Sequence, residues 1–441
     1  MLGVTDLIAA VATPQGSGAV SIIRLSGPGL LDALGKILVI KQSLAKNPRK
    51  MLLGRVQAAD GSIIDEVLVA YFPGPNSFTG EDCAEIQGHA GLIAPSLVLE
   101  AILDAGARLA KPGEFSQRAF LNNRLSLDQA EAIAELVDAQ SRSEAILANR
   151  QLSGALGEKI DPIRRRLINL AATLTAILDF EEPWDEPDQK KMAQDIEAIQ
   201  SALSHLLTLR REGRVFREGL RLVLAGPPNV GKSSLFNALL GHSRALVSPK
   251  PGTTRDYLEA SVSWQGLRVE LVDTAGLWDG SEDDLDRQGQ DLARDQMRRS
   301  DLVLWLRDLA SPDSPPAPET SLPTLTVWAK ADLVSNFDPT ILAISAKTGQ
   351  GLAELKEAAL KILSVNYERP PELVPNFRHQ KALEETAKWV VAADQALKDG
   401  APPDIINLEI GAALNSLGQI TGQVMTEDLL VEVFSHFCLG K

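Results

Sequence analysis

The residues best suited to chemistry lie in the stretch GPPNVGKS, which follows the apolar run Leu222 to Ala225. It matches the pattern G-x-x-x-x-G-K-[ST], with Gly226 and Gly231 at the glycine positions. In such a turn, backbone N–H groups surround a phosphate chain at the start of a helix. Lys232 is placed to reach the outer phosphates, and the Ser233 hydroxyl to hold Mg²⁺. A strand before the turn and a helical pattern after it predict a phosphate-binding loop rather than an empty turn.

Motifs later in the chain, one for the phosphates and two for the base, narrow the choice of nucleotide. DTAG follows an apolar strand, which places Asp273 to reach Mg²⁺ and Gly276 to approach a γ-phosphate. AKAD (329–332) ends another strand, and its Asp332 can accept hydrogen bonds from the ring N–H and amino group of guanine. SAK (345–347) completes the base pocket. Because adenine lacks those donors, these motifs indicate a GTPase, with an ATPase as the main alternative.

Between the phosphate loop and DTAG lies a further motif, TTRD. A threonine there can close over Mg²⁺ when a triphosphate is bound, and we assign this role to Thr254. We therefore predict GTP contacts from all of these motifs: Asn229, Val230, Gly231, Lys232, Ser233, Ser234, Ser248, Pro249, Lys250, Pro251, Gly252, Thr253, Thr254, Asp273, Thr274, Ala275, Gly276, Lys330, Asp332, Ser345, Ala346 and Lys347.

Two positions depart from the usual GTPase pattern. Ala329 stands where GTPases of this class usually have Asn, a loss of order 1 kcal/mol, so we expect guanine specificity with lowered affinity. Leu277 follows DTAG, where Ras-like enzymes carry a Gln that orients water. Another group must then assist hydrolysis. Asn229, together with the loop 248–253, is placed to enclose a monovalent cation near the bridging phosphate oxygens.

The elements that position these motifs form a segment in which strands and helices alternate, from 216 to about 365. Two β-rich stretches flank Gln265-Gly266 and predict a hairpin. The stretches 301–308, 324–332 and 341–347 predict further strands of one buried sheet. We expect a Ras-like P-loop domain with a mostly parallel sheet.

Helical stretches flank this segment on both sides, at 119–215 and 366–441. Apolar spacing predicts a helix over 161–183, with Pro162 in its first turn, and another over roughly 189–211. The simplest architecture is a helical domain that the P-loop domain interrupts. The two helical parts are then expected to pack together.

Residues 1 to about 118 predict a separate mixed α/β domain. The stretches 17–27 and 62–74 are β-rich and end in turn residues. Apolar residues recur at helical spacing over 94–109. The Gly-rich, polar stretch 78–91 is more typical of a site-forming loop and short strand than of packing. The fold class is thus multidomain α/β.

Composition limits the broad class of the protein. The 441 residues are 44% apolar and 23% charged, as in soluble globular proteins. No apolar run approaches ~18 residues, and the first residues lack the basic region of a signal peptide. The net charge of −14 argues against non-specific coating of nucleic acid. Cys83 and Cys438 are too few for a disulfide framework or a zinc cluster, and a cytoplasmic setting without membrane contact is expected.

Long motifs outside the P-loop carry a resemblance. They include ATPQGSGAVSIIRLSG, FPGPNSFTGEDCAEIQGHAG, KPGEFSQRAFLNNRLSLDQAEAIAELVDA and the terminal FCLGK, beside GPPNVGKSSLFNALL, GTTRD and DTAGL. On these motifs the chain resembles, almost end to end, the MnmE (TrmE) family of tRNA-modification GTPases. The resemblance implies an N-terminal tetrahydrofolate-binding and dimerisation domain at 1–118, a helical domain at 119–215 and 366–441, and an inserted G domain at 216–365.

The resemblance also implies an activity. Members hydrolyse GTP with stimulation by potassium, as homodimers in complex with the FAD-containing partner MnmG. Together the two proteins add an aminomethyl or carboxymethylaminomethyl group to carbon five of the wobble uridine of certain tRNAs. The carbon comes from a tetrahydrofolate derivative, 5-formyl- or methylene-tetrahydrofolate.

The family's site residues transfer by motif. The folate contacts fall on Arg24, Glu85, Arg124 and the terminal Lys441. The potassium contacts fall on Asn229, Ser248, Lys250 and Thr253, and those of Mg²⁺ on Ser233 and Thr254. The residue that orients the attacking water falls on Asp286, where Glu is usual; a solvated acid without this role is the alternative.

Two side chains in the family motifs allow more than one role. Cys438 in FCLGK is a candidate catalytic or substrate-contacting thiol, although a buried, inert cysteine is the commoner case. His89 in QGHAG either contacts the folate or caps the loop, and we favour the structural role.

A second function class also fits these motifs. The chain can be a regulatory G protein whose folate domain senses one-carbon status and controls a partner without taking part in chemistry. GEDCAEIQGH and Cys438 favour the tRNA-modifying GTPase over this regulatory protein.

Overall fold

The fold is described from a computed structural model of the chain. The structure describes residues 6–14, 16–180, 186–241, 258–273, 296–311, 315–317, 322–363, 371–435, 437–438 and 440. They divide into two compact units. Unit 1 comprises 1–137, 151–203 and 381–441, and unit 2 comprises 138–150 and 204–380. Each unit is described by itself below.

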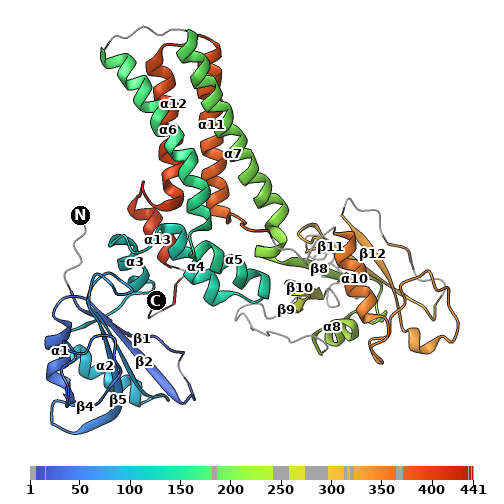
Figure 1. Cartoon of the computed structure of the whole chain (residues 1–441). Coiled ribbons are helices and arrows are strands. Elements are labelled where there is room, and N and C mark those ends of the chain that lie inside the picture. Colours follow the sequence, from blue (N-terminus) through green and yellow to red (C-terminus); the bar gives the residue numbers. More distant parts are fainter. Residues whose placement is uncertain are drawn as a thin grey trace, which may run out of the picture. The chain divides into compact units, whose positions relative to one another are not determined.

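Unit 1 contains a seven-stranded sheet in the order β3-β4-β5-β6-β2-β1-β7 (Figure 1). Neighbouring strands are antiparallel except β1 and β7, which are parallel. The strands are β1 (Ile8–Val11), β2 (Val20–Ser26), β3 (Leu38–Ile40), β4 (Leu52–Gln57), β5 (Ile63–Phe72), β6 (Cys83–His89) and β7 (Arg108–Leu109).

Helices α1 (Leu30–Ile37) and α2 (Ala94–Asp104) bury one face of this sheet in a continuous apolar core. Buried and exposed residues alternate along β2 and β4, as a sheet with one covered face requires. The helix predicted over 94–109 ends five residues early, at Asp104. Gly106 has a positive φ of 115°, which helical residues do not adopt, and the chain turns there into β7.

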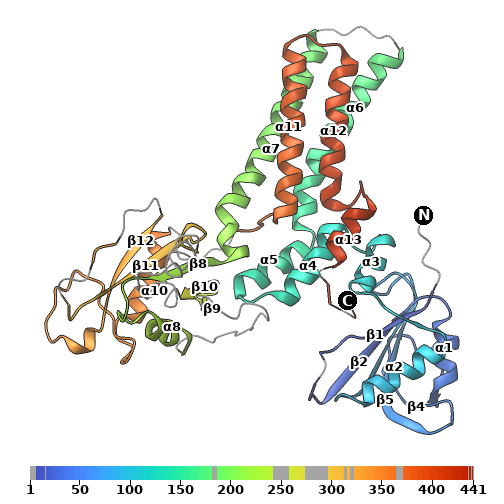
Figure 2. The ribbon, with the colours of Figure 1, turned by 180° about the vertical axis from the view of Figure 1, so that it is seen from behind.

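The rest of unit 1 is helical. It includes α3 (Glu114–Leu121), α4 (Leu127–Asp138), α6 (Ala155–Phe180), α12 (Pro403–Thr421) and α13 (Glu427–Ser435), with parts of α7 (Glu186–Glu218) and α11 (Phe377–Lys398). Helices α6, α7, α11 and α12 run side by side in both Figure 1 and Figure 2. The contact between α6 and α12 joins the two helical stretches that flank the P-loop segment in the sequence.

Two helix boundaries differ from the prediction. Helix α6 begins at Ala155, so Pro162 lies inside the helix and not in its first turn. The missing N–H of Pro162 costs about 3 kcal/mol, and the burial of Leu156 and Ile160 before it offsets that cost. Helix α7 is longer than 189–211 at both ends.

Unit 2 contains a five-stranded sheet in the order β12-β11-β8-β10-β9, with helices α5 (Arg142–Leu152), α8 (Lys232–Gly241) and α10 (Leu352–Ile362). Strands β8 (Leu220–Ala225), β10 (Leu267–Asp273), β11 (Leu302–Asp308) and β12 (Thr324–Ala329) are parallel to one another. Strand β9 (Leu258–Trp264) pairs antiparallel with β10. The predicted hairpin is confirmed, because Gln265 and Gly266 both have positive φ between these strands.

The strand predicted at 341–347 is wrong. Within the described part of the chain, this segment forms one bridge, between Ala343 and Trp328. The N–H of Trp328 donates to Leu342 O, and the N–H of Ile344 donates to Trp328 O. The chain then turns at once, so that the N–H of Ser345 donates to Gln350 O. An apolar run this short forms a single bridge before the turn begins.

Candidate functional site

The phosphate loop connects β8 to α8 in unit 2. Gly226 has a φ of 146°, and a Cβ there would lie 2.6 Å from the carbonyl oxygen of Leu306. Only glycine allows the loop to approach β11 this closely. Asn229 and Gly231 also have positive φ, at 58° and 106°. These conformations turn the backbone sharply before α8 starts at Lys232.

Two side chains at the start of α8 have contrasting environments. Lys232 is 5% exposed, and its Nζ donates to the carbonyl oxygens of Gly226 and Pro227, both at 3.0 Å. Its ammonium group therefore contacts the backbone of the same loop that would surround a phosphate. Ser233 is exposed. Its hydroxyl is a hard oxygen donor of the kind that Mg²⁺ prefers.

Asp273 ends β10 beside this loop. Strand β10 is parallel to β8, and Asp273 is opposite Leu224, so both chain segments leave the sheet at the same edge. The carboxylate is only 2% exposed. The structure therefore brings the P-loop and the first residue of DTAG together, as predicted for residues that share one Mg²⁺ and its phosphates.

The structure brings together two motifs that were predicted to form a base pocket. Ser345 Oγ donates to Asp332 Oδ1 at 2.7 Å, which joins the AKAD and SAK motifs. This hydrogen bond lowers the pKa of Asp332, and the charge of Lys347 adds to the shift. Asp332 is thus held as a carboxylate, the form that accepts hydrogen bonds. Ala346 lies between Ser345 and Lys347 in the sequence.

The sequence did not reveal one interaction beside this pocket. Lys330 has a φ of 65°, and its Nζ lies 2.6 Å from Asp308 Oδ2 at the end of β11. The carbonyl oxygen of Ala329 accepts a hydrogen bond from the N–H of Leu309. The sequence signal for this ion pair was Asp308, an acidic residue at the end of a strand that precedes the AKAD motif in the chain.

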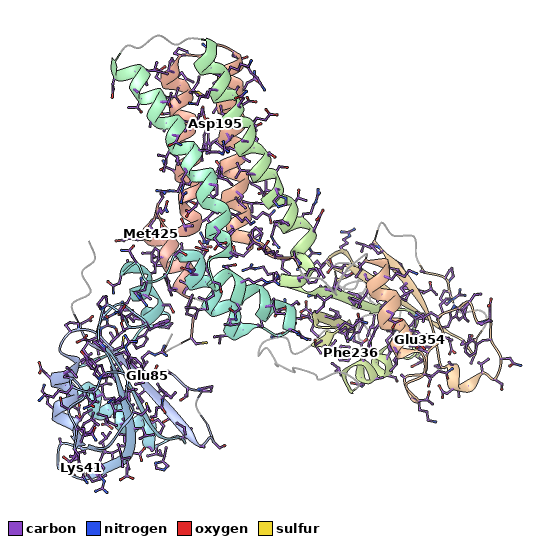
Figure 3. The ribbon with its side chains drawn as sticks, viewed as in Figure 1. Lys41, Glu85, Asp195, Phe236, Glu354 and Met425 are labelled. Atoms are coloured by element: carbon purple, nitrogen blue, oxygen red, sulfur yellow. The ribbon has the colours of Figure 1, made fainter. Side chains whose placement is uncertain are left out.

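A second site lies on the sheet of unit 1. Arg24 on β2 is directly opposite Glu85 on β6. Arg24 Nη2 and Nε donate to Glu85 Oε1 at 2.9 and 3.2 Å. Both side chains are about a quarter exposed. Figure 3 labels Glu85 on this sheet. The resemblance placed both residues in a folate site, and the structure places them in contact.

Aromatic rings and the end of the chain surround Arg24. Its Cζ lies 5.2 Å from the ring centroid of Phe78 and 5.9 Å from that of Phe115. Its Nη1 donates to Gly440 O at 3.5 Å. The carbonyl oxygen of Cys438 accepts from the N–H of Gly113 at 3.4 Å, which holds the tail at α3. Gly440 of the FCLGK motif therefore lies beside Arg24.

Cys438 is exposed, so the burial expected in the commoner case is wrong. The tail is packed on both sides of Cys438: Phe437 is buried in an apolar cluster with Phe434, and a Cβ on Gly440 would meet Val11 O at 2.7 Å. Cys83, in contrast, is buried among Ser26 and Thr79, as expected of a packing residue.

Arg124 joins this site through the loop between β5 and β6. Its Nε donates to Ser77 O at 3.2 Å, next to Phe78. Asn122 Nδ2 donates to Thr79 O at 2.7 Å from the same end of α3. The rings of Phe78 and Phe115 were not predicted as site residues; an aromatic residue inside each family motif was the available signal.

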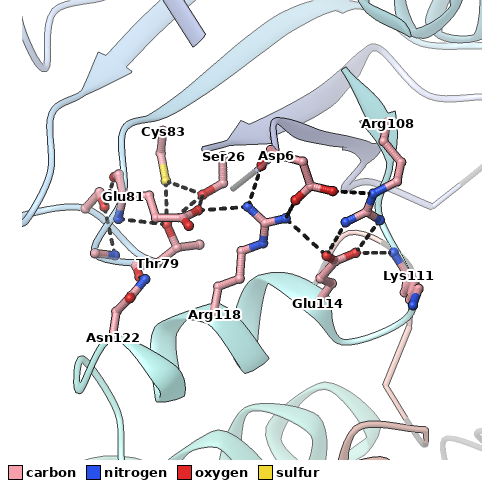
Figure 4. A network of polar contacts seen from close by, with 12 residues as sticks. Asp6, Ser26, Thr79, Glu81, Cys83, Arg108, Lys111, Glu114, Arg118 and Asn122 are labelled. Atoms are coloured by element: carbon pink, nitrogen blue, oxygen red, sulfur yellow. Dashed lines mark hydrogen bonds and ion pairs between the residues drawn. The ribbon is translucent and has the colours of Figure 1, made fainter. Parts of the chain in front are cut away.

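A buried ionic network supports the loop that carries Phe78 (Figure 4). Arg118 on α3 is 1% exposed and contacts Asp6, Glu81 and Glu114 at 2.7 to 3.1 Å. Glu81 Oε2 also accepts from Ser26 Oγ at 2.7 Å. The pKa of Asp6 is lowered, chiefly by the hydrogen bond from Arg108. Sequence reasoning missed this network, because Asp6 and Glu81 are far in the chain from Arg118.

Several predicted site residues lie outside the described residues. They comprise the cation loop, the rest of DTAG, the water-orienting acid and the last residue: Ser248, Pro249, Lys250, Pro251, Gly252, Thr253, Thr254, Thr274, Ala275, Gly276, Asp286 and Lys441.

Comparison with known proteins gives whole-chain matches. Residues 127–438 match the family described as the MnmE helical domain, and residues 7–124 match the GTP-binding protein TrmE N-terminus. The chain is 39% identical to tRNA modification GTPase MnmE of Carboxydothermus hydrogenoformans, over 99% of both chains. The chain belongs to the MnmE family. It is 42% identical to the family member from a Synechococcus strain, over 99% of this chain and 98% of the relative.

The motifs of the MnmE family contain the residues of both candidate sites. The family's long N-terminal motifs supply Arg24 and Glu85, and its P-loop motifs supply Lys232 and Asp332. Among the helices that the structure describes, none has the length and apolar character needed to cross a membrane.

Proposed function

We propose that this chain is a potassium-stimulated GTP hydrolase that acts with the flavoprotein MnmG on certain tRNAs. The two proteins would add an aminomethyl or carboxymethylaminomethyl group to carbon five of the wobble uridine. Membership of the MnmE family supports the coupling of GTP hydrolysis to tRNA modification. A tetrahydrofolate derivative would supply the carbon. The proposed setting is the cytoplasm.

One observation carries the chemical part of this proposal: the C-terminal tail lies at the Arg24–Glu85 pair. Arg24 contacts both Glu85 and the carbonyl oxygen of Gly440. Glu85 is suited to accept hydrogen bonds from the amino and ring N–H groups of a pterin. The exposed thiol of Cys438 is two residues from Gly440. A site that only senses folate has no need of an exposed thiol in the segment that contacts Arg24, so this arrangement supports participation in chemistry.

The remaining folate contacts are proposed at Arg124 and Lys441. Arg124 is exposed and hydrogen-bonded to the loop that carries Phe78. A guanidinium group there suits the carboxylates and carbonyl groups of a folate.

For the nucleotide, we propose Mg²⁺ contacts from Ser233 and Thr254, with Asp273 beside the ion. The oxygen donors of Ser233 and Asp273 fit this ion, which prefers hard oxygen ligands. We propose potassium contacts from Asn229, Ser248, Lys250 and Thr253, with Asp286 orienting the attacking water. The positive φ of Asn229 fits a side chain that leaves the loop toward the phosphates. Equal hydrolysis rates in Na⁺ and K⁺ would contradict the potassium part.

We also propose the three-domain division 1–118, 119–215 with 366–441, and 216–365, and a homodimer formed through the N-terminal sheet. On the face opposite α1 and α2, Leu53 on β4 is directly opposite Leu68 on β5. These side chains are 62% and 41% exposed. Neighbouring exposed leucines on one sheet face support a protein interface there.

The deciding experiment measures the wobble-uridine modification by mass spectrometry of tRNA. A strain that lacks this chain receives the wild type, Cys438→Ser or, as a matched control, Cys83→Ser. We expect the deletion and Cys438→Ser to lose the modification and the other two strains to retain it. Retention in the deletion strain would overturn the proposed function and favour the regulatory G protein. Retention in Cys438→Ser alone would overturn the role of the thiol.

A further inference from the structure

The AKAD motif of unit 2 lacks a side chain that other GTPases of this class have at its first position. Ala329 stands where asparagine is usual, and it is 5% exposed at the end of β12. Its methyl group cannot form a hydrogen bond. The next residue, Lys330, has a φ of 65°, a left-handed conformation that is unfavourable for residues with a Cβ. Such a conformation persists only where surrounding contacts hold it, so another group must brace this motif.

Asp308 is the residue beside Ala329 on the neighbouring strand. Strands β11 and β12 are parallel, and Asp308 is directly opposite Ala329 in their register. Leu306, two residues before Asp308, packs in the same apolar cluster as Ala329 and Val230 of the phosphate loop. Because alternate residues of a strand share a face, Asp308 lies on the face of the sheet that carries this loop. A carboxylate is thus adjacent to the position where an asparagine is missing.

The Asp308 carboxylate contacts two different partners through its two oxygens. Oδ1 accepts a hydrogen bond from the N–H of Ala310 at 2.9 Å, which restrains the rotation of the carboxylate. Oδ2 accepts from Lys330 Nζ at 2.6 Å. The side chains of Asp308 and Lys330 are 21% and 34% exposed, so solvent screens the pair only in part. The pair joins the end of β11 to the residue in the left-handed conformation.

The AKAD motif is therefore held at both ends. Asp332 accepts from Ser345 Oγ at 2.7 Å, and Lys330 is held by its ion pair to β11. Between them, the N–H of Ala331 donates to Ile344 O at 2.9 Å. The methylene chain of a lysine can pack on a flat apolar surface while its ammonium group is bound elsewhere. The chain of Lys330 and the carboxylate of Asp332 thus keep fixed positions relative to each other.

We propose that Asp308 is a positioning residue for guanine binding and performs the role of the asparagine that Ala329 replaces. It holds Lys330, whose methylene chain covers one face of the guanine ring while Asp332 accepts hydrogen bonds from the edge of that ring. The inference rests on the GTP site of the proposed function and adds the residue that positions its base contacts. Affinity for guanine nucleotides then depends on Asp308, and an asparagine restored at position 329 makes Asp308 dispensable.

The test is a double-mutant cycle on the full-length protein, with GDP binding measured by calorimetry. Asp308→Ala should weaken GDP binding about tenfold, because it removes the charged partner that holds Lys330. In a chain that also carries Ala329→Asn, the same substitution should weaken binding less than about twofold, since the asparagine then braces the motif. A general loss of stability would give the same loss in both chains, and that result would overturn the inference.

A second cycle uses Lys330→Met, which keeps the length of the side chain but removes the ion pair from its other end. Because Asp308 acts through Lys330, Asp308→Ala should weaken GDP binding less than about twofold in the Lys330→Met chain. A tenfold loss there would overturn the inference even if Ala329→Asn did not fold. Asp308→Asn, which keeps the shape and an acceptor oxygen but loses the charge, should weaken binding about threefold.

A matched control is Asp301→Ala, directly before the other end of β11. Asp301 is paired with Arg214 and accepts from the N–H of Arg221 at 2.9 Å. Its side chain is 18% exposed, close to the value for Asp308. This variant should keep GDP affinity within about twofold of the wild type, because its ion pair is remote from the AKAD motif.

Thermal unfolding of each variant checks that the chain is folded. Wild-type affinity in Asp308→Ala, or an equal loss in Asp301→Ala, would overturn the role of Asp308. A wild type that does not bind GDP would instead overturn the proposed nucleotide site.

Discussion

The two candidate sites are built in different ways. The nucleotide site is made mostly of backbone: Gly226, Asn229 and Gly231 set the path of a turn on a parallel, apolar sheet. The candidate folate site is made mostly of side chains from β2, β6 and α3, with a carbonyl oxygen from the C-terminal tail. In the first case a short stretch of sequence fixes the geometry. In the second, a folded domain must bring distant residues together.

The difference extends to what stabilises each site. Beside the phosphate loop, Lys232 is held by carbonyl oxygens of its own loop. Beside the candidate folate site, Arg118 is held by Glu114 of its own helix and by Asp6 and Glu81 from distant segments. Removing a buried ionic partner leaves other buried charges without compensation, and that is costly. We therefore expect the folate site to be the more sensitive of the two to single substitutions in its supporting residues.

The largest effect is expected for Arg118→Met. The substitution removes the buried partner of Glu81 and leaves Glu114 with Arg108 alone, which should cost roughly 3–5 kcal/mol of local stability. Hydrogen exchange of the full-length protein should accelerate in peptides covering β6 and α3, and stay unchanged in β8 to β12. The control is Arg55→Met, which breaks the exposed pair Arg55–Glu66 and should cost about 1 kcal/mol or less. Equal acceleration in both variants would show that burial of the network does not matter.

The next effect tests whether the two sites are independent. Lys232→Ala removes the ammonium group that would stabilise the outer phosphates, so GTP hydrolysis should fall roughly 10²- to 10³-fold. Binding of 5-formyltetrahydrofolate should be unchanged. Lys361→Ala on α10, an exposed lysine, serves as the control. Normal hydrolysis in Lys232→Ala would contradict the assignment of the phosphate loop.

The contrast also explains what the sequence could predict. The P-loop, the hairpin at Gln265-Gly266 and the pairing of Asp332 with Ser345 all follow from local motifs at strand ends. The bond between Arg24 and Glu85 does not, because 61 positions separate these residues in the chain and only the pairing of β2 with β6 brings them together. The resemblance named those residues, but physical reasoning on the sequence alone had no means to bring them together.

Errors arose where tertiary contacts outweighed local signals. Pro162 reads locally as a helix start, yet Leu156 and Ile160 are buried and extend α6 in front of it. Residues 341–347 have the composition of a strand, yet the turn after Ser345 limits them to one bridge. The exposure of Cys438 depends on where the tail docks, which the composition of FCLGK does not determine.

A smaller effect is expected in the base pocket. Ser345→Ala removes the hydroxyl that donates to Asp332 and lowers its pKa. The loss of one such bond is worth about 1 kcal/mol, so GTP should bind roughly fivefold more weakly. Titration with a fluorescent GTP analogue measures this loss, and the exposed Thr348→Ala is the control. An unchanged affinity would mean that Asp332 needs no support from the SAK motif.

The smallest effect concerns Asp65 and the exposed His89, whose side chains are hydrogen-bonded. This contact shifts the pKa of the imidazole. The pKa of His89 is raised in the folded chain, so the charged imidazole is favoured there relative to the unfolded chain. The resulting stabilisation is complete below the unfolded pKa and is lost as the pH rises through the folded pKa. Asp65→Asn should lower the pKa of His89, and ¹H–¹⁵N NMR titration of the imidazole measures it. Glu66→Gln should lower this pKa less, because Glu66 acts only through its charge. If the two variants shifted the pKa of His89 equally, the hydrogen bond would not be the main cause.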